Sequence, residues 1–218
     1  MPSELRTRAL SAVLLGSAVL LVTWYSAAGF CVMCVIGGIL LGHEWWMLTR
    51  QRSRLFVPVG MFYIGSAVAS LAMLRQMSAH IVFILFALVW IGDIAAYGTG
   101  KLIGRHKIAP QISPGKTWEG LAGAVMATSG GIYFMLEGAA PWWFACVYGT
   151  LFASVGLAGD LFESSLKRRA GVKDSGTLVV IPGHGGLFDR VDALIPCAIL
   201  LSLLVLGAFY YASISQPF

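Results

Sequence analysis

Long apolar segments alternate with short polar stretches along this chain of 218 residues. The apolar segments run approximately over residues 8–26, 28–48, 55–74, 79–99, 118–136, 140–160 and 192–214. Each is about long enough to cross the ~30 Å hydrocarbon core of a bilayer as an α-helix. A helix also satisfies its backbone hydrogen bonds internally, as lipid requires. The pattern predicts an all-α, polytopic transmembrane helical bundle of about seven spans.

Composition and charge agree with a membrane protein. Hydrophobic residues make up 58% of the chain and charged residues 11%, and the mean hydropathy is +0.80. Soluble domains carry about 25% charged residues, so this composition excludes a water-soluble surface. The net charge of +5 would suit nucleic acid, anionic lipid headgroups or a phosphorylated substrate. The hydropathy favours membrane lipids and phosphates, and no nucleic acid partner is expected.

The basic residues indicate the orientation of the bundle. Two Lys or Arg precede the first predicted span, three follow the second, four follow the fourth and five follow the sixth. Of the 15 basic residues, only Arg75 falls on the other face. Because positively charged loops stay in the cytoplasm, the N-terminus and the polar loops 100–117 and 161–190 are predicted to be cytoplasmic.

No low-complexity linker divides the chain, so residues 1–218 are predicted to form a single integral membrane domain. Residues 1–90 would supply the N-terminal spans, and residues 91–218 would form the catalytic part with both polar loops. Cys31-x-x-Cys34 has the spacing of metal and redox sites. It lies in an apolar run with no second pair, so we interpret both cysteines as small buried hydrophobic residues.

Half of the ten acidic residues fall between Asp160 and Asp192, a density that a simple connecting loop does not need. If the start of this stretch is helical, Asp160, Ser164 and Lys167 are spaced i, i+4, i+7 and share one face. A carboxylate, a hydroxyl and an ammonium on one stripe could hold a metal-bound phosphate. A solvated end of an amphipathic helix would give the same spacing, and this fragment alone does not separate the two.

A glycine-rich turn, residues 182–186, precedes two further carboxylates. Its backbone has few side chains in the way and could offer N–H groups to a phosphate, although alone it is an ordinary turn. Asp189 and Asp192 follow at i, i+3, and two carboxylates on one face can hold Mg²⁺. Arg190 between them could bind a phosphate in bidentate fashion.

The other polar loop carries a weaker phosphate-site pattern. Residues 112–117 resemble the end of a P-loop, but Pro110 stands where the first glycine belongs and no strand is expected before it. Lys116 and Thr117 are predicted to open a helix, whose N-terminus could bind an anion.

Two further acidic residues lie in predicted spans. Asp93 and Tyr97 are spaced i, i+4 near the cytoplasmic end of the fourth segment, and both a structural hydrogen bond and a catalytic role stay open. Glu44, near the end of the second segment, is interpreted as an interfacial or structural residue.

Two composite motifs resemble a known family. The main motif is Ser164-x-x-Lys167-Arg168-x-x-x-x-Lys173-Asp174, followed by Pro182-Gly183-His184-Gly185-Gly186-x-x-Asp189-Arg190-x-Asp192. The upstream motif is Asp93-x-x-Ala96-Tyr97 with Ile112-Ser113-Pro114-x-Lys116-Thr117-x-Glu119-Gly120. Together they are similar to the signature of bacterial phosphatidate cytidylyltransferases (CDP-diacylglycerol synthases) over about residues 90–195. The chain is shorter than many members, and the seven residues between Asp174 and Pro182 are more than this family usually has.

The resemblance implies that CTP and phosphatidate react to give CDP-diacylglycerol and pyrophosphate at the cytoplasmic face of a bacterial inner membrane. It implies Mg²⁺ as cofactor, and a second, monovalent ion and a homodimer stay open. The expected catalytic residues are Asp160, Lys167 and Asp189, and the expected metal ligands are Asp160, Asp189 and Asp192. Contacts to CTP or the lipid headgroup are expected from Lys116, Ser164, Arg168, Lys173, His184 and Arg190.

Two other functions stay open at this point. A cytidylyltransferase or kinase of the same superfamily could act on another lipid, such as an isoprenoid, because lipid-facing helices do not identify the lipid. A transporter or channel would spread its charges through several spans, whereas the charges here cluster at the predicted cytoplasmic ends.

Overall fold

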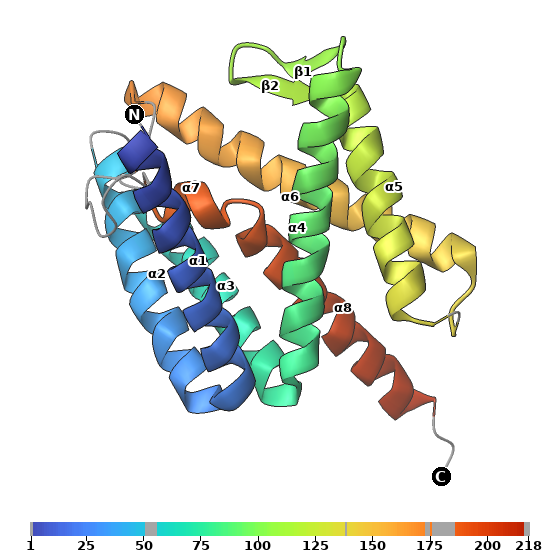
Figure 1. The fold of residues 1–218 in the computed structure, drawn as a ribbon. Coiled ribbons are helices and arrows are strands. Elements are labelled where there is room, and N and C mark those ends of the chain that lie inside the picture. The colour runs from blue at the N-terminus through green and yellow to red at the C-terminus, as the bar shows by residue number, and fades with distance from the viewer. Residues whose placement is uncertain (1, 51–55, 138, 173–174, 176–185, 216–218) are drawn as a thin grey trace.

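The computed structural model describes residues 2–50, 56–137, 139–172, 175 and 186–215, with the side chains of residues 2–12 left out. The chain is an α-helical bundle with one short β-hairpin (Figure 1). Its elements are α1 (Pro2–Tyr25), α2 (Ala27–Thr49), α3 (Phe56–Met77), α4 (Ala79–Leu102), β1 (Lys107–Ala109), β2 (Ser113–Thr117), α5 (Trp118–Met135), α6 (Trp142–Ala170), α7 (Phe188–Val191) and α8 (Leu194–Ile214).

The predicted all-α membrane bundle is confirmed, because each predicted apolar segment contains a long helix. Within the described residues, α2, α3, α4, α6 and α8 are long and apolar enough to cross a membrane. The apolar part of α1 is shorter, Val13–Tyr25, and α5 is a continuous helix that contains several small and hydroxyl-bearing residues and is less apolar. The span count of seven and the orientation of the N-terminus therefore stay predictions.

Helix α6 continues further than its apolar segment, which was expected to end at residue 160. It runs to Ala170 and ends at Gly171, whose φ of 72° is left-handed. Seven of the ten added residues are Leu, Glu, Lys, Arg or Ala, all good helix formers, and glycine is the residue that adopts a left-handed helix end without strain. The predicted loop 161–190 is thus helical over its first third, which places its polar residues on a rigid element.

The polar loop 100–117 contains a hairpin that the sequence analysis did not predict. Strands β1 and β2 pair antiparallel, with Lys107 opposite Thr117 and Ala109 opposite Ser113. Trp118 N donates to His106 O at 3.0 Å and joins the hairpin to the start of α5. These pairings give the loop backbone its hydrogen-bond partners next to an apolar bundle, where unpaired groups are costly.

Close helix packing holds α4, α5 and α6 together, and Figure 1 shows α6 crossing behind α4 and α5. A Cβ on Gly149 of α6 would lie 2.5 Å from Ser129 N of α5, so only glycine permits this crossing. At the same contact Thr128 Oγ1 donates to Gly149 O at 2.9 Å. Small residues and interhelical hydrogen bonds of this kind are the usual means of helix association in membranes.

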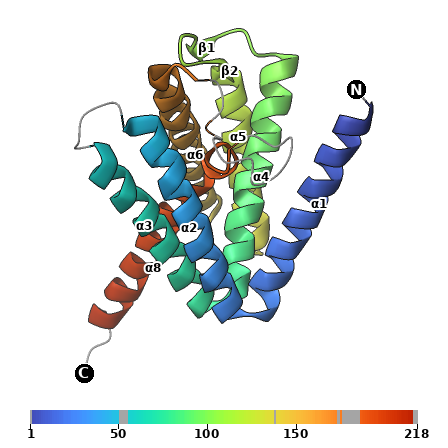
Figure 2. The same ribbon diagram turned by 90° about the vertical axis from the view of Figure 1, so that its left-hand side faces the viewer.

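A second packing centre surrounds the short helix α7. Buried Trp45 of α2, Leu166 of α6, Phe188 of α7 and Ile195 of α8 belong to one apolar cluster. Figure 1 shows α7 between α2 and α6, and Figure 2 shows this short red helix nearly end-on near the centre of the bundle. The polar segment that precedes α8 is therefore held from several sides.

We predict that Gly149→Ala lowers the thermal unfolding midpoint in detergent. Its new Cβ would meet the backbone of Ser129, and overpacking of this kind costs about 1–3 kcal/mol. Gly130→Ala on α5 is the matched control, because nothing lies within 4 Å of its added Cβ. The control is expected to be neutral or stabilising, as alanine favours helix more than glycine does. Equal midpoints for the two variants would contradict the assigned α5–α6 contact.

Candidate active site

A cavity of about 730 Å³ lies among α4, α5, α6 and the start of α8, with the hairpin forming part of its wall. Its charged lining residues are Asp93, Lys101, Lys107, Lys116, Asp160, Asp189 and Asp192. Along α4 the lining passes from Leu88 to Lys101, so apolar side chains line the deeper part of the cavity and lysines line the part near the hairpin. Such a cavity suits a ligand with a polyanionic end and an apolar end.

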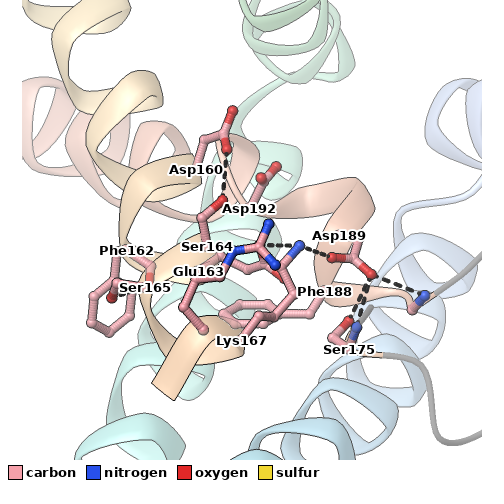
Figure 3. A network of polar contacts seen from close by, with 12 residues as sticks. Asp160, Phe162, Glu163, Ser164, Ser165, Lys167, Ser175, Phe188, Asp189 and Asp192 are labelled. Atoms are coloured by element: carbon pink, nitrogen blue, oxygen red, sulfur yellow. Dashed lines mark hydrogen bonds and ion pairs between the residues drawn. The ribbon is translucent and has the colours of Figure 1, made fainter. Parts of the chain in front are cut away.

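A glycine on α6 lets two acidic residues from different segments lie close to each other. A Cβ on Gly159 would lie 2.3 Å from Asp192 O and 2.6 Å from Pro196 Cγ. The chain entering α8 can therefore pack directly on the α6 backbone beside Asp160. Figure 3 shows the Asp160 and Asp192 side chains near each other.

Lys116 reaches this pair from the hairpin. Its Nζ forms an ion pair with Asp160 Oδ2, and Ser164 Oγ lies 3.5 Å from Asp160 Oδ1. The shared helical face predicted for Asp160 and Ser164 is thus present. Lys116 lies in β2 rather than in a helix, because α5 begins at Trp118 with Thr117 as its N-cap.

Asp192 precedes α8 and lies outside that helix. Burial and the neighbouring Asp160 carboxylate raise the pKa of Asp192 to about 7. The Ala193 amide donates to Asp192 Oδ1 at 2.8 Å and partly offsets this effect. A carboxylate that burial and a second carboxylate keep near its uncharged form would be stabilised in its charged form by a cation.

Asp189 lies in a different part of the site from Asp160. Its Oδ1 pairs with Lys167 Nζ, and its Oδ2 accepts from Ser175 N at 3.0 Å and Gly186 N at 3.2 Å (Figure 3). Burial alone would raise the pKa of Asp189, but hydrogen bonds with Glu163 and Lys167 outweigh it and lower that pKa to about 2.

The predicted metal ligands are therefore only partly assembled. Asp160 and Asp192 come together on the cavity, whereas the Asp189 carboxylate is engaged by Lys167 and the backbone. Within the described part of the chain, no three His, Cys, Asp or Glu residues are grouped closely enough to hold a metal ion.

The remaining predicted residues differ in their surroundings. Arg168 Nε donates to Ile112 O at 3.2 Å and so connects α6 to the hairpin. Arg190 lies on α7 beside Asp189 and is exposed. Lys173 and His184 lie outside the described residues, so their predicted contacts remain untested. Cys31 and Cys34 are free thiols, and Cys34 is buried.

The structure adds residues that the sequence analysis did not select. Lys101 lines the cavity together with Asp93 and Tyr97, and their four-residue spacing on one helix was a usable signal. Lys107 joins the lining because the hairpin places it opposite Thr117, which no periodicity showed.

Glu163 is almost fully buried on α6, and its Oε2 lies 2.8 Å from Lys167 Nζ. Its spacing of i, i+4 to Lys167 was the available signal. Glu44 of α2 joins the site through hydrogen bonds to residues more than 130 positions away, and nothing in its local sequence indicates them.

The fold and this site define a multi-pass membrane protein with a cavity lined by aspartates and lysines. Residues 53–207 match the cytidylyltransferase family. The phosphatidate cytidylyltransferase of Brucella suis biovar 1 is 35% identical over 253 aligned residues, covering 92% of this chain and 93% of the relative. The protein of that name from Staphylococcus saprophyticus is 34% identical over 154 residues, covering 69% and 58%. That from Mycobacterium tuberculosis H37Rv is 42% identical over 121 residues, covering 54% and 36%. The chain belongs to the cytidylyltransferase family.

We predict that Asp192→Asn raises the unfolding midpoint in detergent at pH 8 with EDTA present. The folded-state pKa of about 7 lies above the unfolded value of about 3.9. Ionised Asp192 therefore destabilises the fold increasingly as the pH rises from about 4 through 7. The advantage of the variant should shrink at pH 5. Thermal unfolding at both pH values checks this, and an advantage that grows toward pH 5 would contradict it.

Proposed function

We propose that this chain transfers CMP from CTP to phosphatidate, giving CDP-diacylglycerol and pyrophosphate. The observation that carries this proposal is the 35% identity to a phosphatidate cytidylyltransferase over nearly the whole of both chains. The cavity supports it, because its lysine-rich part suits phosphates and its apolar part suits a lipid. Both substrates therefore have matching surroundings within one site.

We place the protein in the bacterial inner membrane, with the site facing the cytoplasm. The relatives quoted above are bacterial, and 14 of the 15 Lys and Arg fall on the predicted cytoplasmic face. The lysines of the cavity belong to that same face. This orientation gives the site direct access to cytosolic CTP.

The reaction requires little covalent help from the protein. A phosphatidate oxygen attacks the α-phosphorus of CTP in line, the new P–O bond forms, and the bond to the β-phosphate bridge breaks. Pyrophosphate takes the bonding electrons. Lys101, Lys107 and Lys116 line the cavity, and we expect them to bind phosphate oxygens. To do so, Lys116 would give up part of its ion pair with Asp160. Positioning and charge stabilisation of this kind account for most phosphoryl-transfer catalysis.

We propose Mg²⁺ as the cofactor, held chiefly by Asp160 and Asp192. Carboxylate oxygens are the ligands that Mg²⁺ prefers, and Asp160 and Asp192 lie together on the cavity, where burial and the Asp160 carboxylate raise the pKa of Asp192. When bound, Mg²⁺ would neutralise charge on the phosphates. Asp189 lines the same cavity and holds Lys167, the residue that we expect to stabilise charge on the departing pyrophosphate.

The proposed activity predicts CMP transfer to lipid by the purified protein. With labelled CTP, phosphatidate and Mg²⁺, labelled lipid and pyrophosphate should form in equal amounts, and EDTA should abolish both. Isoprenoid phosphates and isoprenoid alcohols serve as the comparison acceptors. Transfer to one of these instead of phosphatidate would identify another enzyme of the superfamily. If no lipid supports CTP consumption, the proposed activity fails and a transporter or channel becomes the better hypothesis.

We predict that Asp189→Asn reduces CDP-diacylglycerol formation below detection while the protein stays folded in detergent. The amide removes the charge that holds Lys167 in a part-buried ion pair, so the ammonium is no longer fixed where we expect it to act. Glu137→Gln, at an exposed acid between α5 and α6, is the control and should retain activity. Near-normal turnover by Asp189→Asn would remove Asp189 from the catalytic group.

A further inference from the structure

Glu44 is a buried acidic residue of α2 with a relative exposure of 2%. It lies before residues 53–207, the part that the family model matches. Its Oε1 accepts from Leu187 N at 2.8 Å, and its Oε2 accepts from Phe188 N at 2.9 Å. Ser175 Oγ lies 3.0 Å from the same Oε2. All three donors belong to the segment that carries Asp189.

Burial makes these contacts mutually dependent. A buried carboxylate is costly unless hydrogen bonds replace its water. The amides of Leu187 and Phe188 begin α7, where a helix has no internal acceptors for its first N–H groups. The Glu44 carboxylate and the two amides therefore satisfy each other's hydrogen-bonding groups, and the start of α7 is held against α2.

Ser175 extends this connection to Asp189. Its Oγ lies 3.0 Å from Glu44 Oε2 and 3.1 Å from Asp189 Oδ2, and its amide also donates to Asp189 Oδ2. A serine hydroxyl has one hydrogen and donates to one of the two carboxylates at a time. The two acids are thus coupled through a single side chain that is itself buried.

The residue next to Glu44 packs on the same element. The Trp45 ring meets Phe188 edge-on at 6.0 Å between centroids and stacks on Phe162 of α6 at 5.9 Å. Trp45 Nε1 also donates to Phe56 O at 2.9 Å, at the start of α3. Helix α2 therefore contacts the start of α7 through two adjacent residues. Glu44 accepts hydrogen bonds from its amides, and Trp45 packs against the Phe188 ring.

We infer that Glu44 is a positioning residue of the cytidylyltransferase site. It acts through Ser175, Leu187 and Phe188 to hold Asp189 against Lys167. This inference rests on the proposed function for its kinetic consequence, but the contact itself is open to a separate test. It gives the N-terminal helices a part in the chemistry beyond anchoring.

The test compares Glu44→Gln, Ser175→Ala and their combination with the unaltered protein. In Glu44→Gln the amide NH₂ faces a backbone donor, so one of the two α7 amides loses its acceptor. Loss of one buried hydrogen bond should lower kcat about tenfold to a hundredfold, with a smaller change in the KM for CTP. The double variant should be about as slow as the slower single variant, because both act on one connection.

Hydrogen exchange provides a readout besides activity. Glu44→Gln should speed exchange of the 187–191 amides and leave the long helices unchanged. Thr49→Val is the matched control on the same helix: Thr49 is equally buried, but its hydroxyl donates to Trp45 O within α2. The control should change neither kcat nor exchange at α7.

Two results would overturn the inference. One is a kcat within twofold of the unaltered protein for both Glu44→Gln and Ser175→Ala. The other is exchange of the 187–191 amides in Glu44→Gln that is as slow as in Thr49→Val and in the unaltered protein. If the unaltered protein transfers no CMP, the proposed function fails on its own, and the exchange comparison still decides whether Glu44 holds α7.

Discussion

The ion pair between Lys167 and Asp189 is the contact on which the rest of the site depends. It joins α6, a long apolar helix, to α7, a four-residue helix with little packing surface of its own. Glu163 contacts the same ammonium at 2.8 Å from one turn earlier on α6. A buried charge without a partner is strongly destabilising, so this arrangement fixes the relative position of the two segments.

The architecture follows from the same constraint on charge in an apolar bundle. Lys116 pairs with Asp160, and Glu44 is satisfied by amides and a hydroxyl. Both of these partnerships join elements that are distant in sequence. The hairpin, α2, α6 and α7 therefore converge on one region, and glycines such as Gly159 allow the backbones to approach closely enough.

Much of the fold could be read from the sequence, because apolar length determines where membrane helices occur. The segment 140–160 was too short because hydropathy falls where α6 becomes polar, although its helix continues to Ala170. The hairpin was missed for another reason. Strands β1 and β2 are three and five residues long, and pairing between such short strands depends on the neighbouring helix ends rather than on any periodic pattern.

The site was predictable where its contacts are local. The spacing of Asp160 and Ser164 on one helical face needed only the period of the helix. The different electrostatic surroundings of the acids were not predictable, because Asp189 and Asp192 are only three residues apart yet their pKa values shift in opposite directions. That difference comes from the surroundings: burial and the Asp160 carboxylate raise the pKa of Asp192, whereas hydrogen bonds with Glu163 and Lys167 of α6 lower the pKa of Asp189. A motif therefore selects the acidic and basic residues to consider, while the tertiary contacts determine which carboxylate pairs with Lys167 and which lies buried beside another carboxylate.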